Sequence, residues 1–144
     1  MDFEISGVPT IELADAGYVL TLTQADDPTA PLTNRKGEAL TVTVAGQDSK
    51  RYRDATRSNL NARLQAAPGV ARRNPTAEEL ESSGLRVTVK CVLSWTGFMD
   101  ASGAAIDCTP AAVIDLLVKY PFVRDQIEGA MLNRANFTPK SPTT

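Results

Sequence analysis

Hydrophobic and polar residues alternate along two segments near the start of the chain, residues 18–23 and 40–44. Alternation over this length, in segments rich in Val, Leu, Thr and Tyr, predicts two half-buried strands. Between them, residues 26–37 combine Asp, Pro, Asn and Gly, which are typical of turns. We therefore expect a β-hairpin with a long exposed tip. Residues 3–13 are expected to add an edge strand, irregular because Pro9 cannot donate a hydrogen bond to a neighbouring strand.

The spacing changes after Gly46, and residues 49–67 predict an amphipathic helix. They contain no proline or glycine, and Asp48 or Ser49 is suited to cap the helix before a break at residues 68–69. Four residues recur at every fourth position and predict its buried stripe: Tyr52, Thr56, Leu60 and Leu64. Basic residues occupy much of the remaining surface: Lys50, Arg51, Arg53, Arg57 and Arg63.

Two periodicities overlap in the next segment. Thr76 and Glu79 form a capping-box pattern, which predicts that a helix begins there. Helical spacing then relates one set of apolar residues: Leu80, Val87, Cys91, Trp95 and Phe98. Strict alternation relates another set: Leu85, Val87, Val89, Cys91, Leu93 and Trp95. The cap and the closing Gly97 favour a helix over residues 77–96, with a strand over residues 85–95 as the alternative. In either case, Trp95 is expected to be a buried core anchor.

Two further helices are predicted near the end of the chain. Thr109 is suited to cap the first, with Pro110 at its first position, and Pro121 begins the second. The residues expected to face inward on the first are Val113, Ile114, Leu117 and Val118. Those expected to face inward on the second are Val123, Ile127, Ala130 and Met131. The second helix is expected to end near Asn136.

These elements together predict an α+β fold, with an N-terminal β-hairpin or small sheet followed by about four α-helices. The hairpin region, residues 1–46, and the helical region, residues 47–137, are expected to form one domain, because 144 residues is an ordinary domain length. Residues 138–144 are expected to be a flexible tail. No run of about 18 apolar residues is present, so we expect no membrane partner.

The composition argues against most enzyme chemistry. The chain has no histidine, which excludes Ser-His-Asp and Cys-His catalysis and removes the usual general base at neutral pH. Its two cysteines are too few for an ordinary zinc site, which needs about four ligands. No glycine-rich phosphate-binding motif occurs. We therefore expect no catalytic residues, no cofactor, no bound metal and no small-molecule substrate.

Charge is distributed unevenly along the chain. Residues 1–46 carry seven acidic and two basic residues, whereas residues 47–73 carry seven basic and two acidic residues. This opposition predicts self-association, in which the acidic hairpin region of one copy meets the basic helix of the next. The residues expected to bind partners are Lys50, Arg53, Arg57, Ile127, Met131 and Phe137. Nucleic acid is a less favoured partner of the basic helix, because the chain is acidic overall.

Several short motifs, in order and spacing, resemble the tail assembly chaperones of siphophages, small proteins encoded between the tail tube and tape measure genes. In the first part of residues 40–137 they are Val44-Ala45-Gly46-Gln47-Asp48-Ser49, Tyr52-Arg53, Trp95-Thr96-Gly97-Phe98 and Asp100-Ala101-Ser102-Gly103. The remaining ones are Cys108-Thr109-Pro110, Tyr120-Pro121, Gln126-Ile127 and Asn133-Arg134-Ala135-Asn136-Phe137.

The resemblance implies a non-enzymatic protein of the host cytoplasm that binds the helical tape measure protein during tail assembly. The tail tube protein is a further partner that it implies. Two alternatives remain on the sequence alone: a structural protein of the tail or the head-tail connector, and a small nucleic-acid-binding regulator that uses the basic helix.

Overall fold

Three short strands form an antiparallel sheet, in the order β1-β2-β3. The computed structural model describes residues 3–65 and 76–139. The strands are β1 (Tyr18–Thr21), β2 (Thr41–Val44) and β3 (Val92–Thr96). The helices are α1 (Ile11–Ala16), α2 (Lys50–Leu64), α4 (Ala77–Cys91), α5 (Pro110–Lys119), α6 (Pro121–Met131) and the 3-10 helix η1 (Arg134–Phe137). The predicted α+β class is confirmed.

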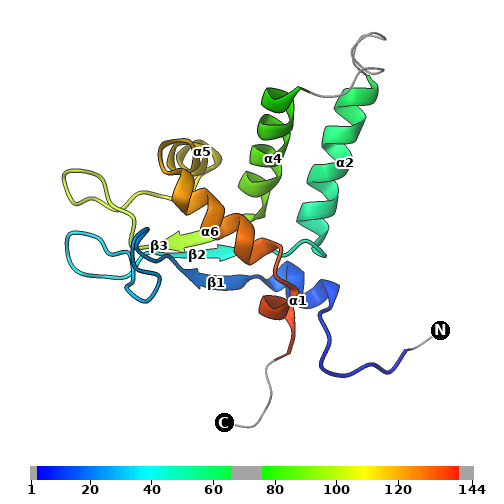
Figure 1. The fold of residues 1–144 in the computed structure, drawn as a ribbon, viewed down its shortest axis with the longest axis horizontal. Helices are drawn as coiled ribbons and strands as arrows, with labels where there is room; N and C mark the ends of the chain where they lie inside the picture. Colours follow the sequence, from blue (N-terminus) through cyan, green and yellow to red (C-terminus); the bar gives the residue numbers. More distant parts are fainter. Residues whose placement is uncertain (1–2, 66–75, 140–144) are drawn as a thin grey trace.

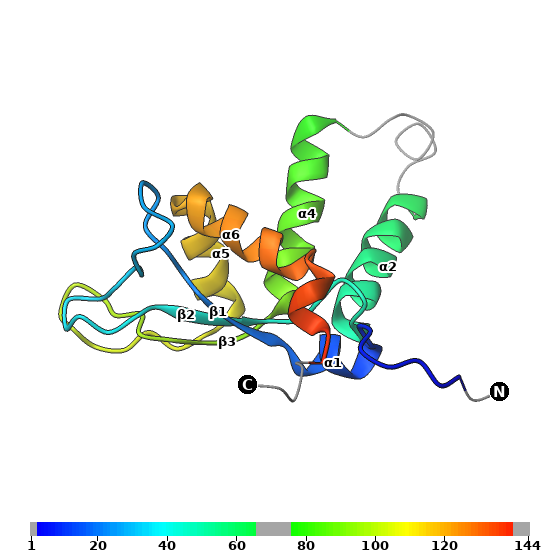
Figure 2. The same cartoon turned by 60° about the horizontal axis from the view of Figure 1, so that its bottom comes forward.

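The sheet has one covered face, on which α6 lies, and α5 packs against α6 and α4 on the same side (Figure 1). The alternation predicted for the first two strands is present, since Val42 and Val44 of β2 are fully buried on the covered face. Strand pairing places Tyr18 and Leu20 of β1 opposite them, and Trp95 of β3 opposite Val42. Figure 2 shows α2 and α4 side by side, projecting away from the sheet.

The long connection between β1 and β2 folds back on itself. Three backbone hydrogen bonds link its leucines: Leu22 N to Leu40 O at 2.9 Å, Leu32 N to Leu22 O at 2.8 Å, and Leu40 N to Leu32 O at 2.9 Å. Leu22 is fully buried, whereas most of residues 25–38 are exposed. The predicted hairpin with a long exposed tip is therefore confirmed, with a buried leucine at its base.

The predicted helix over residues 77–96 is wrong in its second part. The capping box at Thr76 and Glu79 is present, but α4 ends at Cys91 and the chain continues directly as β3. Both periodicities of the sequence are therefore used, one after the other. Pairing of β3 with β2 decides where the change occurs, and it also places the third strand outside the N-terminal region.

The predicted edge strand over residues 3–13 is also wrong. The Thr10 hydroxyl accepts a hydrogen bond from Leu13 N and caps the short helix α1 instead. Helix α1 also helps to cap the N-terminus of α2. Asp15 Oδ1 accepts a hydrogen bond from Lys50 N at 2.7 Å, while the predicted cap, Ser49, accepts one from Tyr52 N. Two of the unpaired N–H groups of the first turn of α2 are satisfied in this way.

The predicted apolar stripe of α2 is mostly exposed, because its packing against α4 relies on small and polar residues. Ala55 is the buried side chain, whereas Leu60 and Leu64 are exposed. Asn59 Nδ2 donates to the Ser83 carbonyl at 3.0 Å and joins the two helices. Sequence periodicity selects the most apolar face, but the polar contacts to α4 select a different one. The break and linker predicted at residues 68–75 lie outside the described residues.

Helices α5 and α6 cover the sheet to different extents. The four residues predicted to face inward on α6 are all buried. On α5 only Val113 and Leu117 are buried, and Ile114 and Val118 are exposed, which corrects half of the prediction. Gln126 fixes α6 to the sheet connection, since its side-chain amide accepts from Thr23 N and donates to Thr23 O, each at 2.9 Å.

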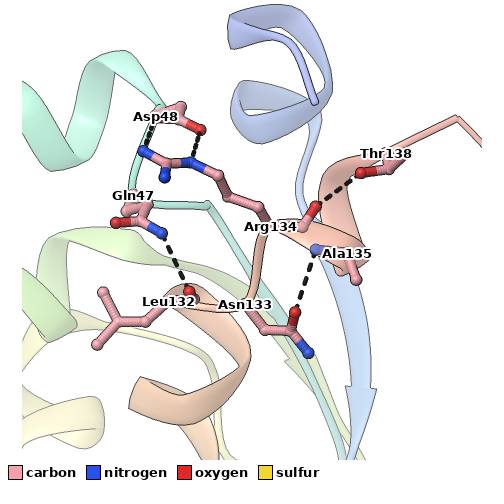
Figure 3. A network of polar contacts seen from close by, with 7 residues as sticks. All are labelled: Gln47, Asp48, Leu132, Asn133, Arg134, Ala135 and Thr138. Carbon is pink, nitrogen blue, oxygen red and sulfur yellow. Dashed lines mark hydrogen bonds and ion pairs between the residues drawn. The ribbon is translucent and has the colours of Figure 1, made fainter. Parts of the chain in front are cut away.

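After α6, the chain turns back into η1, whose Phe137 is buried. Two side chains from the segment after β2 hold this end (Figure 3). Arg134 donates to both carboxylate oxygens of Asp48, at 2.8 and 2.9 Å, and this hydrogen bonding lowers the pKa of Asp48. Gln47 Nε2 donates to the Leu132 carbonyl at 3.0 Å. The helix predicted to reach residue 136 thus ends at residue 131, and most of the predicted tail lies outside the described residues.

The close packing of Phe137 should require a glycine at position 46. A Cβ atom at Gly46 would lie 2.8 Å from ring carbons of Phe137, too close for an unstrained contact. We expect Gly46→Ala to lower the free energy of unfolding by about 1–3 kcal/mol, because the ring must move in a packed core. Urea unfolding followed by circular dichroism measures the change.

Gly129→Ala provides the matched control. This glycine lies within α6, and nothing comes within 4 Å of a Cβ atom at its position. Replacement should therefore stabilise the protein by about 0.5–1 kcal/mol, through the lower entropy cost of alanine in a helix. Equal effects of the two substitutions would contradict a specific contact between Gly46 and Phe137.

Candidate protein-binding groove

A groove of about 790 Å³ lies where the connection from β1 to β2 and the connection from β3 to α5 meet helices α5 and α6. We call it the loop groove. Both connections project from the same end of the sheet (Figure 1). Its apolar lining comes mainly from Trp95, Phe98, Met99, Ile106, Leu116 and Phe122. A concave surface lined by aromatic and aliphatic side chains is suited to bind apolar groups.

Hydrogen-bonded turns give a definite shape to both connections, which we call the first loop (β1 to β2) and the second loop (β3 to α5). In the first loop, Asn34 Oδ1 accepts from Lys36 N at 2.9 Å, and Asn34 Nδ2 donates to the Gly97 carbonyl of the second loop at 2.8 Å. In the second loop, the Asp100 carboxylate accepts from Ser102 N at 2.9 Å and from Ala104 N at 3.0 Å. The Asn34 bridge joins the two walls, so the groove is built before any partner binds.

Trp95 lies at the base of the loop groove. Its ring packs on Phe98, with centroids 4.6 Å apart, and its Nε1 donates to the Ile106 carbonyl at 2.8 Å. The sequence predicts a buried anchor, but the ring is only half-buried. The reason is that β3 is an edge strand, so one side of Trp95 is left to the loops. Trp95 therefore both supports the second loop and contributes apolar surface to the groove.

Charged residues of both signs line the outer part of the loop groove: Arg35, Asp100, Asp115 and Lys119. Lys119 and Asp115 pair across one turn of α5 at 3.6 Å. Hydrogen bonds, first from the Ser102 hydroxyl, hold the pKa of Asp100 below its usual value, so it is ionised at neutral pH. These carboxylates are engaged in turn and helix contacts, an arrangement that orders the groove and does not resemble an acid–base pair.

The structure separates the six residues predicted to bind partners into two groups. Lys50, Arg53 and Arg57 are exposed on the outer face of α2, and none forms an ion pair with a carboxylate of residues 3–65 or 76–139. The other three residues are buried in the core: Ile127, Met131 and Phe137. Their prediction as a binding surface is corrected, because their apolar character serves the packing of α6 and η1 against the sheet.

Neither cysteine is poised for reaction. Both are free thiols, and burial raises the pKa of Cys91 to about 11. Partial burial also raises the pKa of Cys108. A nucleophilic cysteine needs a lowered pKa, so both thiols remain protonated at neutral pH. Within residues 3–65 and 76–139, no three Cys, Asp or Glu residues gather as metal ligands. No helix in this part of the chain is long and apolar enough to cross a membrane.

No pattern in the sequence predicts the loop groove. Its residues come from two loops and two helices that are distant in sequence, and single loop residues carry no periodicity. One signal was present, since Trp95, Phe98 and Met99 concentrate apolar side chains around a turn. Apolar residues beside a tight turn often remain accessible, because a loop buries few of its own side chains.

Acid should loosen the second loop. Because the folded chain lowers the pKa of Asp100, its contribution is present above the usual aspartate pKa of about 3.9 and is lost as the pH falls through the lowered value. The fluorescence of Trp95, the single tryptophan, should shift to the red when the loop loosens. We expect this shift in the native protein only as the pH falls below the lowered pKa of Asp100, and already at pH 7 in Asp100→Ala. An unshifted Asp100→Ala spectrum would contradict the role of this turn.

Comparisons with known proteins identified no relative of this chain. No protein-family model matches the chain. No curated protein and no solved structure matches it either.

Proposed function

We propose that the chain is a non-enzymatic tail assembly chaperone, which binds an apolar helical segment of a tape measure protein in the loop groove. The observation that carries the proposal is the groove itself, about 790 Å³ in volume and lined mainly by aromatic and aliphatic side chains. The identity of the partner rests on the resemblance of the sequence motifs to those of siphophage tail assembly chaperones.

The physical fit between groove and partner is that of helix-in-groove recognition. An amphipathic helix presents apolar residues at every third or fourth position, and a groove between loops and helices can receive several of them. Trp95 and Phe98 offer large apolar surfaces with few rotatable bonds, which lowers the entropy lost on binding. Charges on the rim, Arg35 and Asp115 among them, are suited to pair with the polar face of such a helix.

A chaperone with these properties would act before the tail tube encloses its partner. A long helical protein exposes apolar stripes when free in the host cytoplasm, and such stripes promote aggregation. Covering successive stripes with copies of a small protein keeps the partner soluble through many weak contacts. Contacts of this kind are also reversible, which the tube protein requires in order to replace the chaperone.

Ile106→Asp tests the proposal directly. The Ile106 side chain lines the loop groove and is 37% exposed. Its two hydrogen bonds involve only the backbone of Ile106: its N–H donates to the Phe98 carbonyl, and its carbonyl accepts from Trp95 Nε1. A carboxylate there would be desolvated by an apolar helix, so we expect the Kd for a purified tape measure segment to rise at least about tenfold. Isothermal titration calorimetry measures the Kd.

Leu132→Asp is the control, because Leu132 is an exposed apolar side chain (51%) outside the lining of the loop groove. It should leave the Kd within about twofold of the original value. The proposal fails if the unchanged chain does not bind the tape measure protein. Equal loss of affinity in both variants would mean that general surface hydrophobicity, and not the loop groove, carries the binding.

A further inference from the structure

A second, smaller groove lies between α2, α4 and α5, and we call it the helix groove. It has a volume of about 290 Å³ and shares no residue with the loop groove. Its floor is apolar and is formed by Ala55, Leu85, Val89, Pro110 and Ile114. Ile114 was predicted to be buried but is 42% exposed, since it faces this groove and not the sheet. The helix groove therefore accounts for the exposure of Ile114, an apolar side chain that does not pack in the core.

The rim of the helix groove is basic. Arg86 and Lys90 of α4 line it, are exposed, and lie four residues apart, so their like charges repel each other on one helix face. Arg51 of α2 adds a third cation beside them, because its guanidinium donates to the Lys90 carbonyl at 3.2 Å. None of these three forms an ion pair with a carboxylate in the described parts of the chain. An acidic ligand would relieve this repulsion.

The chain carries a segment with the complementary character. Residues 3–9, which we call the arm, extend away from the body in both views (Figures 1 and 2). Phe3 is 78% exposed and Ile5 is 65% exposed, with the acidic Glu4 between them. In an extended segment, alternate side chains point to opposite sides, so the two apolar residues can enter a groove while the carboxylate stays near its rim.

We propose that the arm of one copy docks in the helix groove of a second copy. Phe3 and Ile5 of the first copy would cover the apolar floor around Ile114 of the second, and Glu4 would pair with Arg86 or Lys90. This assigns the self-association expected from the charge distribution to particular residues, with an arm of few residues in place of the whole hairpin region. The inference does not depend on the proposed function, because it uses neither the loop groove nor its partner.

An interface between the arm and the helix groove is heterologous, because the two are different surfaces. A copy whose arm is bound to a second copy therefore still has its own helix groove empty. Copies can then add one after another into a ring or an open row. A pair with both interfaces formed at once is the special case in which the ring closes at two.

Two variants test the arm and the helix groove separately. Phe3→Ser with Ile5→Ser removes the apolar residues of the arm, and Ile114→Asp places a repelling carboxylate in the groove. All three positions are exposed, and circular dichroism of each variant should match that of the unchanged chain. We expect each variant to raise the Kd of self-association at least about tenfold in sedimentation velocity. Leu132→Asp, which lies on neither groove, should leave it unchanged.

Mixing the two variants gives the decisive result. The arm variant keeps an intact groove and the groove variant keeps an intact arm, so a mixture should form a one-to-one dimer that neither variant forms alone. The dimer should weaken as salt is raised to about 1 M, where the Debye length is about 3 Å. No dimer in the mixture, or a monomeric unchanged chain at high concentration and low salt, would overturn the proposal. A monomer in which the backbone amide of Ile5 is protected from hydrogen exchange would show that the arm docks within its own chain. That result would also overturn the proposal.

Discussion

Strand β2 pairs along both of its edges, and the rest of the structure is arranged around this constraint. One partner, β1, precedes it by a single folded connection, but the other, β3, comes only after α2 and α4. The chain must therefore leave the sheet as one helix, return as another, and enter β3 without a loop at Cys91. Val42 and Val44 are buried by this double pairing and by α6, so losing the register would expose the centre of the core.

Both grooves follow from the same arrangement. Because β3 is an edge strand, Trp95 has the two connecting loops on one side, and these loops form the walls of the loop groove. Because α2 and α4 project from the sheet and α5 packs against α4 and α6, a groove is left between α2, α4 and α5, the helix groove. A small sheet with helices on one face thus has two apolar grooves, which share no lining residue. Binding of a partner in one and of another copy in the other need not compete.

The features predictable from sequence were those set by neighbouring residues. The alternation of β1 and β2, the caps Ser49, Thr76 and Thr109, and the inward face of α6 depend on local spacing and local hydrogen bonds, and the structure contains them. The features decided by distant partners were missed. The change from helix to strand after Cys91 depends on pairing with β2, and the buried face of α2 depends on the bond from Asn59 to α4. The grooves depend on four or three elements at once, which no periodicity encodes.

Hydrogen exchange measured by mass spectrometry, for the chain alone and mixed with the tape measure protein proposed as its partner, tests the proposed binding surface without any substitution. Binding in the loop groove predicts slower exchange in residues 31–35 and 97–106 and in α5, whose residues line it, with little change on the outer face of α2. Slower exchange confined to residues 50–64, where Lys50, Arg53 and Arg57 lie, would contradict it and assign the contact to the basic helix.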